Sequence, residues 1–422
     1  MSPVAERCIA PRDALRASLA YHFRDGTIDD VFARHGSVQF DPLAPLGTSH
    51  DLVFGARVPG YRIGDWHDAV HRRRRAYDGW DKQASLVALE GQPARRRYHE
   101  WHGARWMAEI DRDWPRERDE VLAQLANRGP LEAAEIDLDV RVEAWRGSWY
   151  GPRLAKRIVR ALWHAGRIGT RERRAGRHVY DLIERVLPRE VLERPDPHPD
   201  EALRTLILDR HRAAGVLRPD APRDLWSVPV PASVRRAAIA TLVEEGRLLP
   251  LRIGEVPVHA VPGWLRALDG DRGLDGARLV APLDPLVWDR EGLRRAFGFD
   301  YLWEVYKPVA RRRWGWYVLP VVQRDRFVGR IEGALEARPG GERVWRIDRW
   351  WWEEGLAPVP SAPLESRLAE DLERAAARFA HYLGARRAVI RGGVPRAVAG
   401  VLRDGAAADW TVARSAAQEG AS

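Results

Sequence analysis

Apolar residues recur every four positions near the start of the chain, at Leu15, Leu19 and Phe23. One face of a helix repeats at this spacing, so the pattern predicts a helix over residues 12–34. The segment Ser37-Val38-Gln39-Phe40-Asp41-Pro42 follows, and its polar and apolar side chains alternate up to a proline. This alternation predicts a short extended strand that the proline ends.

A second helical pattern covers residues 65–75 and ends in four consecutive arginines at 72–75. Charged residues and tryptophans continue beyond it, and we place Trp101, Trp106 and Trp114 on helices. The N-terminal part of the chain is therefore predicted to be mainly helical, with one short strand.

A short pattern occurs twice in the middle of the chain. Leu-Trp-His-Ala-Gly-Arg-Ile at 162–168 matches Leu-Val-Glu-Glu-Gly-Arg-Leu at 242–248, and a further glycine and a β-like run follow each copy. The proline-rich stretch 195–199 separates the copies and predicts a linker. Each copy ends a predicted helix and begins a two-stranded ribbon, which is the plan of a winged helix.

The sequence around the first copy predicts two helices, a basic loop and a strand. Residues 131–136 predict a short helix, and Gly151-Pro152 opens another, which carries Leu154, Ile158 and Leu162 on one face. A basic loop is predicted over 171–177, and a strand over 178–182.

The chain becomes rich in strands and aromatic residues after Gly276. Residues 316–322 and 327–331 predict paired strands joined at 323–326, and residues 343–352 predict another strand. A final amphipathic helix is predicted over 364–379, and the last dozen residues are small and polar, so we expect them to be frayed.

The composition adds a charge argument. The 422 residues carry 69 basic and 60 acidic side chains, a formal charge of +9, and only Lys82, Lys156 and Lys307 are lysines. The length allows two to four domains, and the hydrophobic and charged fractions, 45% and 31%, are those of a globular protein. Arginine in place of lysine can reflect base composition, but a surplus of bases over acids favours a polyanionic partner, either nucleic acid or an anionic surface.

Several classes of site are excluded. The single cysteine, Cys8, excludes an internal disulfide and a cysteine-based zinc cluster. His67 and His71 stand four apart without a catalytic glutamate between them or a third ligand, so we predict no metal site. No Gly-rich loop precedes a helix, which argues against nucleotide cofactors. No apolar run is long enough to span a membrane and residues 1–7 lack a signal core, so we expect a cytoplasmic protein.

The segment Gln39-Phe40-Asp41 is the most informative candidate for chemistry. In an extended chain Gln39 and Asp41 share one face, where an amide and a carboxylate can hold and deprotonate a water molecule. The structural alternative is that Asp41-Pro42 starts a turn and Gln39 is solvated. His50 could join the same site or be a structural histidine, and Lys82 could form a Schiff base with a deoxyribose aldehyde or be solvated.

Three basic runs, at 72–75, 95–97 and 311–313, are weaker candidates. Such runs are usually solvated faces. The third is interleaved with Trp314 and Trp316, a combination that suits a strand that binds phosphates.

Several segments together resemble a known family. Ala-Pro-Leu-Asp-Pro-Leu-Val-Trp-Asp-Arg at 281–290, with 297–301, 304–306 and 311–320, is similar to the YcaQ-like winged-helix DNA glycosylases of the AlkX/AlkZ superfamily. Residues 179–188, and 38–42 followed by His50, Leu52 and Arg57, are similar as well. The resemblance runs from about residue 12 to residue 383.

The resemblance implies an α+β fold in which three tandem winged-helix motifs are scaffolded by an all-β domain. The whole is C-shaped, and its basic concave face receives duplex DNA. It implies five segments: a first winged-helix unit with the Gln-Phe-Asp motif, a second, a third, an all-β scaffold, and a C-terminal helix with a short strand and tail. These are residues 1–115, 116–194, 195–265, 266–360 and 361–422.

The resemblance also implies an activity. Family members hydrolyse the N-glycosidic bond of N7-alkylated purines and unhook interstrand DNA crosslinks, leaving abasic sites. Gln39-Phe40-Asp41 matches the Gln-hydrophobic-Asp motif of the AlkX branch. We therefore expect a monomeric, monofunctional DNA repair glycosylase without metal or cofactor, acting on double-stranded DNA at the nucleoid of a bacterial cytoplasm. The alternative is a non-catalytic winged-helix transcriptional regulator.

Residue roles follow from the matched positions. Asp41 is expected to activate water and Gln39 to position it. Two departures bear on substrate range, because family members often have arginine at the position of Thr48 and histidine at that of Lys82. Lys82 also leaves open a lyase step after base removal. The residues expected to bind DNA are His50, Arg57, Tyr61, Lys82, Lys156, Arg311, Arg312 and Arg313.

Overall fold

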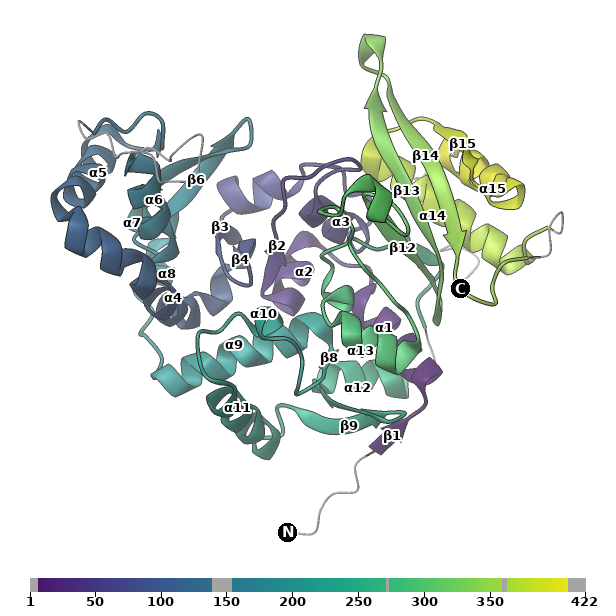
Figure 1. The fold of residues 1–422 in the computed structure, drawn as a ribbon, viewed down its shortest axis with the longest axis horizontal. Helices are drawn as coiled ribbons and strands as arrows, with labels where there is room; N and C mark the ends of the chain where they lie inside the picture. The colour runs from purple at the N-terminus through teal and green to yellow at the C-terminus, as the bar shows by residue number, and fades with distance from the viewer. Residues whose placement is uncertain (1–6, 139–153, 271–272, 359–362, 409–422) are drawn as a thin grey trace.

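The computed structural model describes residues 7–138, 154–270, 273–358 and 363–408 (Figure 1). It is a mixed α+β fold with a four-stranded, a five-stranded and a six-stranded sheet. A helical lobe lies at the left of Figure 1, and long strands lie at the right. The first strands of the six-stranded sheet lie between them. Within the described ranges, no helix combines the length and the apolar character needed to cross a membrane.

The predicted single helix over residues 12–34 is wrong in one respect, because the chain forms two helices there. Thr27 starts the second helix with a capping box, in which its hydroxyl accepts from the Asp30 N–H and the Asp30 carboxylate accepts from the Thr27 N–H. Gly36, at a φ of +66°, then turns the chain into the predicted strand. These elements are β1 (Arg7–Ile9), α1 (Pro11–His22), α2 (Ile28–His35) and β2 (Ser37–Gln39).

The six-stranded sheet has the order β2-β4-β3-β6-β7-β5 and joins the N-terminal part of the chain to the left-hand lobe. Asp78 of β3 pairs with Thr170 of β6 across that junction. The helix predicted over 65–75 is limited to a π-helical turn, Asp68–Arg72, because β3 begins at Ala76. The strands are β3 (Ala76–Trp80), β4 (Ala84–Ala88), β5 (Leu131–Glu132), β6 (Ile168–Arg174) and β7 (Arg177–Leu182), and a short helix, α3 (Ser49–Gly55), follows β2.

The left-hand lobe corrects two further predictions. Residues 131–136 are not a helix, because Leu131 and Glu132 pair with β7 as the edge strand β5. The basic segment 171–177 is mostly strand, since only residues 175 and 176 form the turn between β6 and β7. Trp101 and Trp106 lie on a helix as predicted, whereas Trp114 stands between two helices. The helices are α4 (Gln92–Asp113), α5 (Pro115–Arg128), α6 (Leu154–His164), α7 (Ile183–Val186) and α8 (Arg189–Leu192).

The repeated sequence pattern is confirmed as repeated local structure. Gly166 and Gly246 each follow a helix with φ near +65°, at +65° and +67°, and Gly176 and Gly254 have positive φ in the hairpin turns. Glycine adopts this left-handed conformation at little cost. The second copy lies among α9 (Pro199–Ala214), β8 (Val216–Leu217), α10 (Arg223–Trp226), α11 (Ala232–Glu244), β9 (Leu249–Ile253), β10 (Val256–Ala260) and α12 (Pro262–Asp269), and β1 pairs with β9 in parallel.

The C-terminal part confirms the predicted paired strands, the following strand and the amphipathic helix. Its five-stranded sheet runs in the order β11-β12-β13-β14-β15. Gly151-Pro152 and the last dozen residues, for which a helix start and a frayed end were predicted, lie outside the described residues. The elements are β11 (Ala277–Leu279), α13 (Arg290–Phe297), β12 (Val318–Gln323), β13 (Arg326–Ala337), β14 (Arg343–Trp352), α14 (Ser366–Leu383), β15 (Ala388–Gly393) and α15 (Arg396–Ala407).

One apolar core connects the two ends of the sequence. Val38 of β2 and Phe54 of α3 belong to the same buried cluster as Tyr317, Trp345 of β14 and Phe379 of α14. Burial of apolar area of this kind is the main favourable term in folding. The strand that carries Gln39 is therefore held against the five-stranded sheet and its covering helix.

Candidate active site

The register of β2 decides which way the candidate side chains face. This strand pairs with β4, and the Phe40 N–H donates a 2.7 Å hydrogen bond to the Ala84 carbonyl, so the extended conformation continues beyond Gln39. Val38 is buried in the large core, whereas Gln39 and Asp41 are partly exposed. Since alternate residues of an extended chain share one face, Gln39 and Asp41 emerge on the same side.

The Asp41 carboxyl group accepts a hydrogen bond within a turn and has a raised pKa. Its Oδ1 accepts a 2.9 Å hydrogen bond from the Leu43 N–H, so the turn of the structural alternative is present. Burial raises the pKa of Asp41 above its ordinary value, and the hydrogen bond from Leu43 offsets this only in part. A carboxylate in such a place is a better proton acceptor than a solvated one.

Lys82 lies against Gln39. Its Nζ is 3.5 Å from Gln39 Oε1 and 5.4 Å from the centre of the Trp288 ring. Burial, together with the positive charge of Arg210, lowers the pKa of Lys82 to about 8. Gln39 belongs to β2 and Lys82 to the β3–β4 turn, forty-three positions later in the sequence. The structure therefore brings Lys82 to the proposed site.

Phe40 is fixed between two flat groups. The His50 ring stacks on it with centroids 4.2 Å apart, and the Arg173 guanidinium lies 3.8 Å from the ring centre. Arg173 also donates to Asp78 at 2.5 Å, so β6 of the left-hand lobe is tied to the motif. Neither contact was visible in the sequence, because nothing near Arg173 marks it as different from the other arginines of its basic segment.

Within this stack, His50 is the member inside the protein and does not lie on the surface. It is fully buried, and its Nε2 lies 2.9 Å from the Thr48 hydroxyl, which also caps α3. Burial and the charge of Arg173 hold the pKa of His50 well below its ordinary value, so the ring is neutral. His50 therefore forms part of the wall behind Phe40.

Tyr61 and Arg57 are also buried in the protein. The Tyr61 hydroxyl donates to Asp51 at 2.8 Å. Arg57 donates from both terminal nitrogens to Asp284, at 2.7 and 2.8 Å, and neither side chain of this ion pair is exposed. The expected DNA contacts of His50, Arg57 and Tyr61 therefore do not fit their burial, and Arg57 instead ties α3 to the segment 281–290.

Lys156 lies on α6 at an open cleft in the left-hand lobe. The cleft has a volume of about 1150 Å³ and is lined by aromatic and basic side chains from α4, α6 and β7. Arg157 covers the Trp114 ring at 4.9 Å, and Arg160 covers the Trp106 ring at 4.7 Å. The sequence showed these residues separately but did not indicate that they line one surface.

Arg311, Arg312 and Arg313 lie in the loop before β12. Arg313 covers the Trp314 ring at 4.6 Å and pairs with Asp300 at 3.3 Å, while Arg311 is exposed. Buried Glu304, at the other end of this loop, accepts hydrogen bonds from the backbone N–H groups of residues 313 and 314, at 3.0 and 2.7 Å. The arginines are therefore presented by an ordered loop.

Tyr317, next to this loop, is a buried residue that the sequence did not single out. Its hydroxyl has no hydrogen-bond partner among the described residues. Burial and the negative charge of Asp41 raise the pKa of Tyr317 well above its ordinary value. Tyr317, which follows this loop in the sequence, therefore lies within the electrostatic influence of Asp41.

His67 and His71 take part in aromatic contacts beside the site. The His67 ring stacks on Trp66 with centroids 3.8 Å apart, and Trp66 in turn meets His50 edge-on. The described part of the chain holds no group of three or more histidine, cysteine, aspartate or glutamate residues that could bind a metal ion.

Comparison with known proteins identifies the family. Residues 32–382 match the model of the AlkZ-like DNA glycosylases. The chain belongs to this family. The structure is also similar to that of the DNA glycosylase AlkZ from Streptomyces sahachiroi, with a TM-score of 0.57, 16% sequence identity, and coverage of 92% of this chain and 99% of that one. At this identity the likeness establishes a shared fold.

Family membership gives the site its chemical context. DNA is the substrate of an AlkZ-like glycosylase, and the reaction class is cleavage of the bond between base and sugar. The matched region contains Gln39, Asp41 and Lys82 of the site, as well as Lys156 and the arginines at 311–313.

Proposed function

We propose that this AlkZ-like protein hydrolyses the N-glycosidic bond of N7-alkylated purines in duplex DNA, with Asp41 and Gln39 as the catalytic pair. The observation that carries the proposal is the raised pKa of the Asp41 carboxyl group, which stands two positions after Gln39 and is partly exposed as Gln39 is. A positioned carboxylate of this kind is a suitable general base for water.

The chemistry of the lesion matches what the two side chains offer. An N7-alkylguanine is cationic, so it leaves the sugar without a general acid. The remaining tasks are to stabilise an oxocarbenium-like sugar and to supply a nucleophile. The ionised Asp41 carboxylate performs the first by its negative charge and accepts the proton of the attacking water, while Gln39 holds that water.

The Gln39-Phe40-Asp41 motif supports a place in the AlkX branch, and hence an ability to unhook interstrand crosslinks. A crosslinked base remains tethered to the opposite strand and resists full extrusion from the helix. The partly exposed positions of Gln39 and Asp41 on the strand suit such a substrate better than a closed pocket. We further propose a monofunctional, monomeric enzyme that needs neither metal nor cofactor and acts in the cytoplasm.

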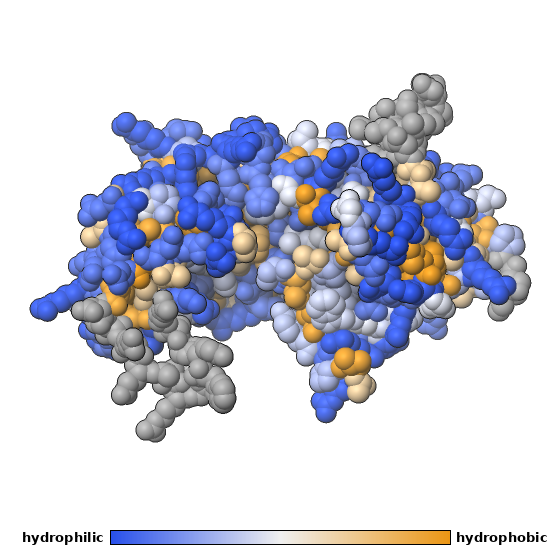
Figure 2. Space-filling model, turned by 90° about the horizontal axis from the view of Figure 1, so that it is seen from above, coloured by the Kyte–Doolittle hydropathy of each residue, from blue (hydrophilic) through white to orange (hydrophobic). Residues whose placement is uncertain are grey.

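For the architecture we propose three winged-helix units, over residues 1–115, 116–194 and 195–265, held in a C shape by residues 266–360 with the C-terminal segment 361–422. The helix, helix and hairpin order around β6–β7 and again around β9–β10 supports this division. The surface seen from above is predominantly hydrophilic, with apolar residues in smaller groups (Figure 2).

DNA contacts are proposed for four basic residues from two parts of the chain. Lys156 lies on α6 in the left-hand lobe, and Arg311, Arg312 and Arg313 precede β12. Aromatic rings accompany both groups, through Trp106 and Trp114 near Lys156 and Trp314 next to Arg313. Cations with adjacent aromatic rings suit both phosphates and unstacked bases.

The test is an incubation of the protein with duplexes that carry a single N7-methylguanine or a nitrogen-mustard crosslink, followed by cleavage of abasic sites with alkali. We expect abasic product from both lesions, and none from undamaged DNA. Absence of product from both would overturn the proposal. If the protein instead bound one undamaged sequence tightly as a dimer, the alternative of a winged-helix regulator would be correct.

A further inference from the structure

Two neighbouring residues of the β3–β4 turn contact two residues on one face of β2. Ser37 and Gln39 share this face, because they are two residues apart in an extended strand. The Ser37 hydroxyl donates to Asp81 Oδ2 at 2.5 Å, and Lys82 Nζ lies 3.5 Å from Gln39 Oε1. Neighbouring residues of the turn therefore contact alternate residues of the strand that leads to Asp41.

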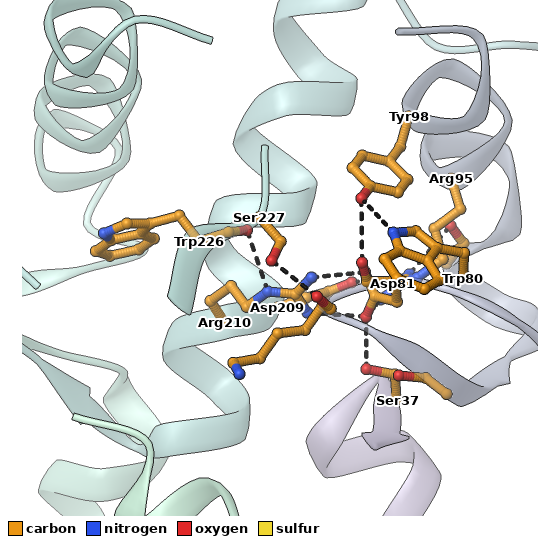
Figure 3. Close-up of polar contacts among 12 residues, drawn as sticks. Ser37, Trp80, Asp81, Arg95, Tyr98, Asp209, Arg210, Trp226 and Ser227 are labelled. Atoms are coloured by element: carbon orange, nitrogen blue, oxygen red, sulfur yellow. Dashed lines mark hydrogen bonds and ion pairs between the residues drawn. The ribbon is translucent and has the colours of Figure 1, made fainter. Parts of the chain in front are cut away.

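Asp81 is held by a buried cluster of charges drawn from three parts of the chain (Figure 3). Arg210 of α9 donates to both of its carboxylate oxygens, at 2.8 and 2.6 Å, and Arg95 of α4 lies 3.5 Å from Oδ2. Arg95 also pairs with Asp209 at 3.1 Å, so the cluster contains two positive and two negative groups. Burial alone would raise the pKa of Asp81, but the two arginines outweigh it, and the pKa is lowered.

The backbone of the turn is fixed by further hydrogen bonds. The Tyr98 hydroxyl donates to the carbonyl of Asp81 at 3.1 Å, and the Ser227 hydroxyl donates to the carbonyl of Lys82 at 2.9 Å. Removing one partner from a buried ion pair leaves an uncompensated charge, so the cluster resists rearrangement. The position from which the Lys82 side chain starts is thus set by α4, α9 and residue 227.

The end of the Lys82 side chain is confined as well. It is mostly buried, and Nζ lies over the Trp288 ring while it contacts Gln39. Trp288 belongs to the segment 281–290 and is itself anchored, since its Nε1 donates to the Leu283 carbonyl at 2.9 Å. Because the Lys82 side chain is already confined in the folded protein, it loses little further conformational entropy when it holds Gln39.

This contact has a chemical consequence for Gln39. A lysine ammonium group can only donate hydrogen bonds, so the side-chain atom of Gln39 that faces it is the carbonyl oxygen. The amide N–H groups then point away from Lys82. A water molecule held by such an N–H accepts with one lone pair, keeps a proton for the Asp41 carboxylate, and keeps its second lone pair for the sugar carbon.

We propose that Lys82 is a positioning residue that fixes the orientation of the Gln39 amide, so that Gln39 donates to the water that Asp41 deprotonates. This inference rests on the proposed function of Gln39 and Asp41. It differs from the expectation that Lys82 binds DNA, because it has Lys82 act through Gln39 within the protein.

The proposal makes the rate depend on the charge of Lys82. Burial is the main cause that lowers the pKa of Lys82 to about 8, Arg210 and Arg290 lower it further, and Asp224 and Asp81 oppose them. As the pH rises through about 8, the ammonium becomes an amine that can accept as well as donate, and Gln39 is no longer restrained. The single-turnover rate should therefore fall above this pH.

The test compares Lys82→Met, Lys82→Arg and the wild-type protein on the N7-methylguanine duplex under single-turnover conditions. Lys82→Met keeps an apolar stem without a donor and should lower the saturating rate about tenfold, because a misplaced reacting group lowers the rate. Lys82→Arg keeps a donor that stays charged, so it should retain most of the rate and lose the decline above about pH 8. Lys156→Met serves as a contrast and should weaken DNA binding, because it removes a cation from the proposed DNA contacts.

Two further measurements separate this proposal from others. In a Gln39→Ala background, Lys82→Met should have no additional effect, since the lysine acts through the glutamine. Full activity of Lys82→Met in a wild-type background would overturn the positioning role while leaving the proposed function intact, whereas an inactive wild-type protein would overturn the proposed function itself. Borohydride should trap no covalent complex between the protein and abasic DNA. A trapped complex that Lys82→Arg abolishes would overturn the positioning role, because Lys82 would then be a nucleophile.

Discussion

At the scale of single residues, the sequence predicted the directions of side chains but not their partners. The alternation of Val38, Gln39 and Asp41 was enough to place an amide and a carboxyl group on one face. The contact of Lys82 with Gln39 was not predictable, because it forms between strands through the fold. The role of Arg57 was missed for a related reason, since nothing in one sequence distinguishes an arginine in a buried ion pair from one that faces DNA.

The buried pair of Arg57 and Asp284 leads to a prediction about stability. Arg57→Met should lower the free energy of unfolding by about 3–5 kcal/mol, because it leaves the Asp284 carboxylate buried without its counter-charge. The double variant Arg57→Met with Asp284→Leu should recover part of this loss. Urea denaturation followed by tryptophan fluorescence measures both. A loss below about 1 kcal/mol in the single variant would contradict the structural role given to Arg57.

At the scale of helices and strands, the predictions succeeded where a pattern was local and strong. The strand at 343–352 and the helix that includes residues 366–379 follow from their own periodicity. The prediction for 131–136 was wrong because pairing with β7 overrides local preference there. The single helix over 12–34 was wrong because the Thr27 and Asp30 capping box begins a second helix.

This capping box can be tested directly. Thr27→Ala removes the side-chain acceptor at the start of α2 and should lower the free energy of unfolding by about 1 kcal/mol. Thr241→Ala is a matched control, because Thr241 lies within α11 and its hydroxyl donates to the Ala237 carbonyl one turn earlier. Its effect should stay within about 0.5 kcal/mol. Equal melting temperatures for Thr27→Ala and the wild-type protein would contradict the capping role.

At the scale of the whole molecule, pairings between distant parts of the chain decide the arrangement. β1 pairs with β9, β3 pairs with β6, and the charge cluster around Asp81 joins α4 and α9 to the β3–β4 turn. A repeat in the sequence revealed two similar units, but not how they join, since pairing between remote segments leaves no local pattern. The net charge of +9 favoured a polyanionic partner, either nucleic acid or an anionic surface, and the family specifies DNA.

That charge predicts a strong dependence of DNA binding on salt. Each phosphate contact releases counterions, so affinity for undamaged duplex should fall steeply between about 50 and 200 mM salt. Arg311→Ala combined with Arg313→Ala should reduce the slope of log affinity against log salt by about 2, one for each lost phosphate contact. Fluorescence anisotropy with a labelled duplex measures the slope. An unchanged slope would remove these arginines from the DNA-binding surface.

The central claim is that an ionised Asp41 acts as the base beside Gln39, and the most direct measurement is the pH dependence of the single-turnover rate on N7-methylguanine DNA. Burial raises the pKa of Asp41, and the base must be deprotonated, so the rate should be low in acid and rise to a plateau, with a midpoint above the ordinary pKa of aspartate. Asp41→Asn should lose this rise, and its rate should be about a hundredfold lower on the plateau. A variant with wild-type rate and the same acid limb would contradict the account.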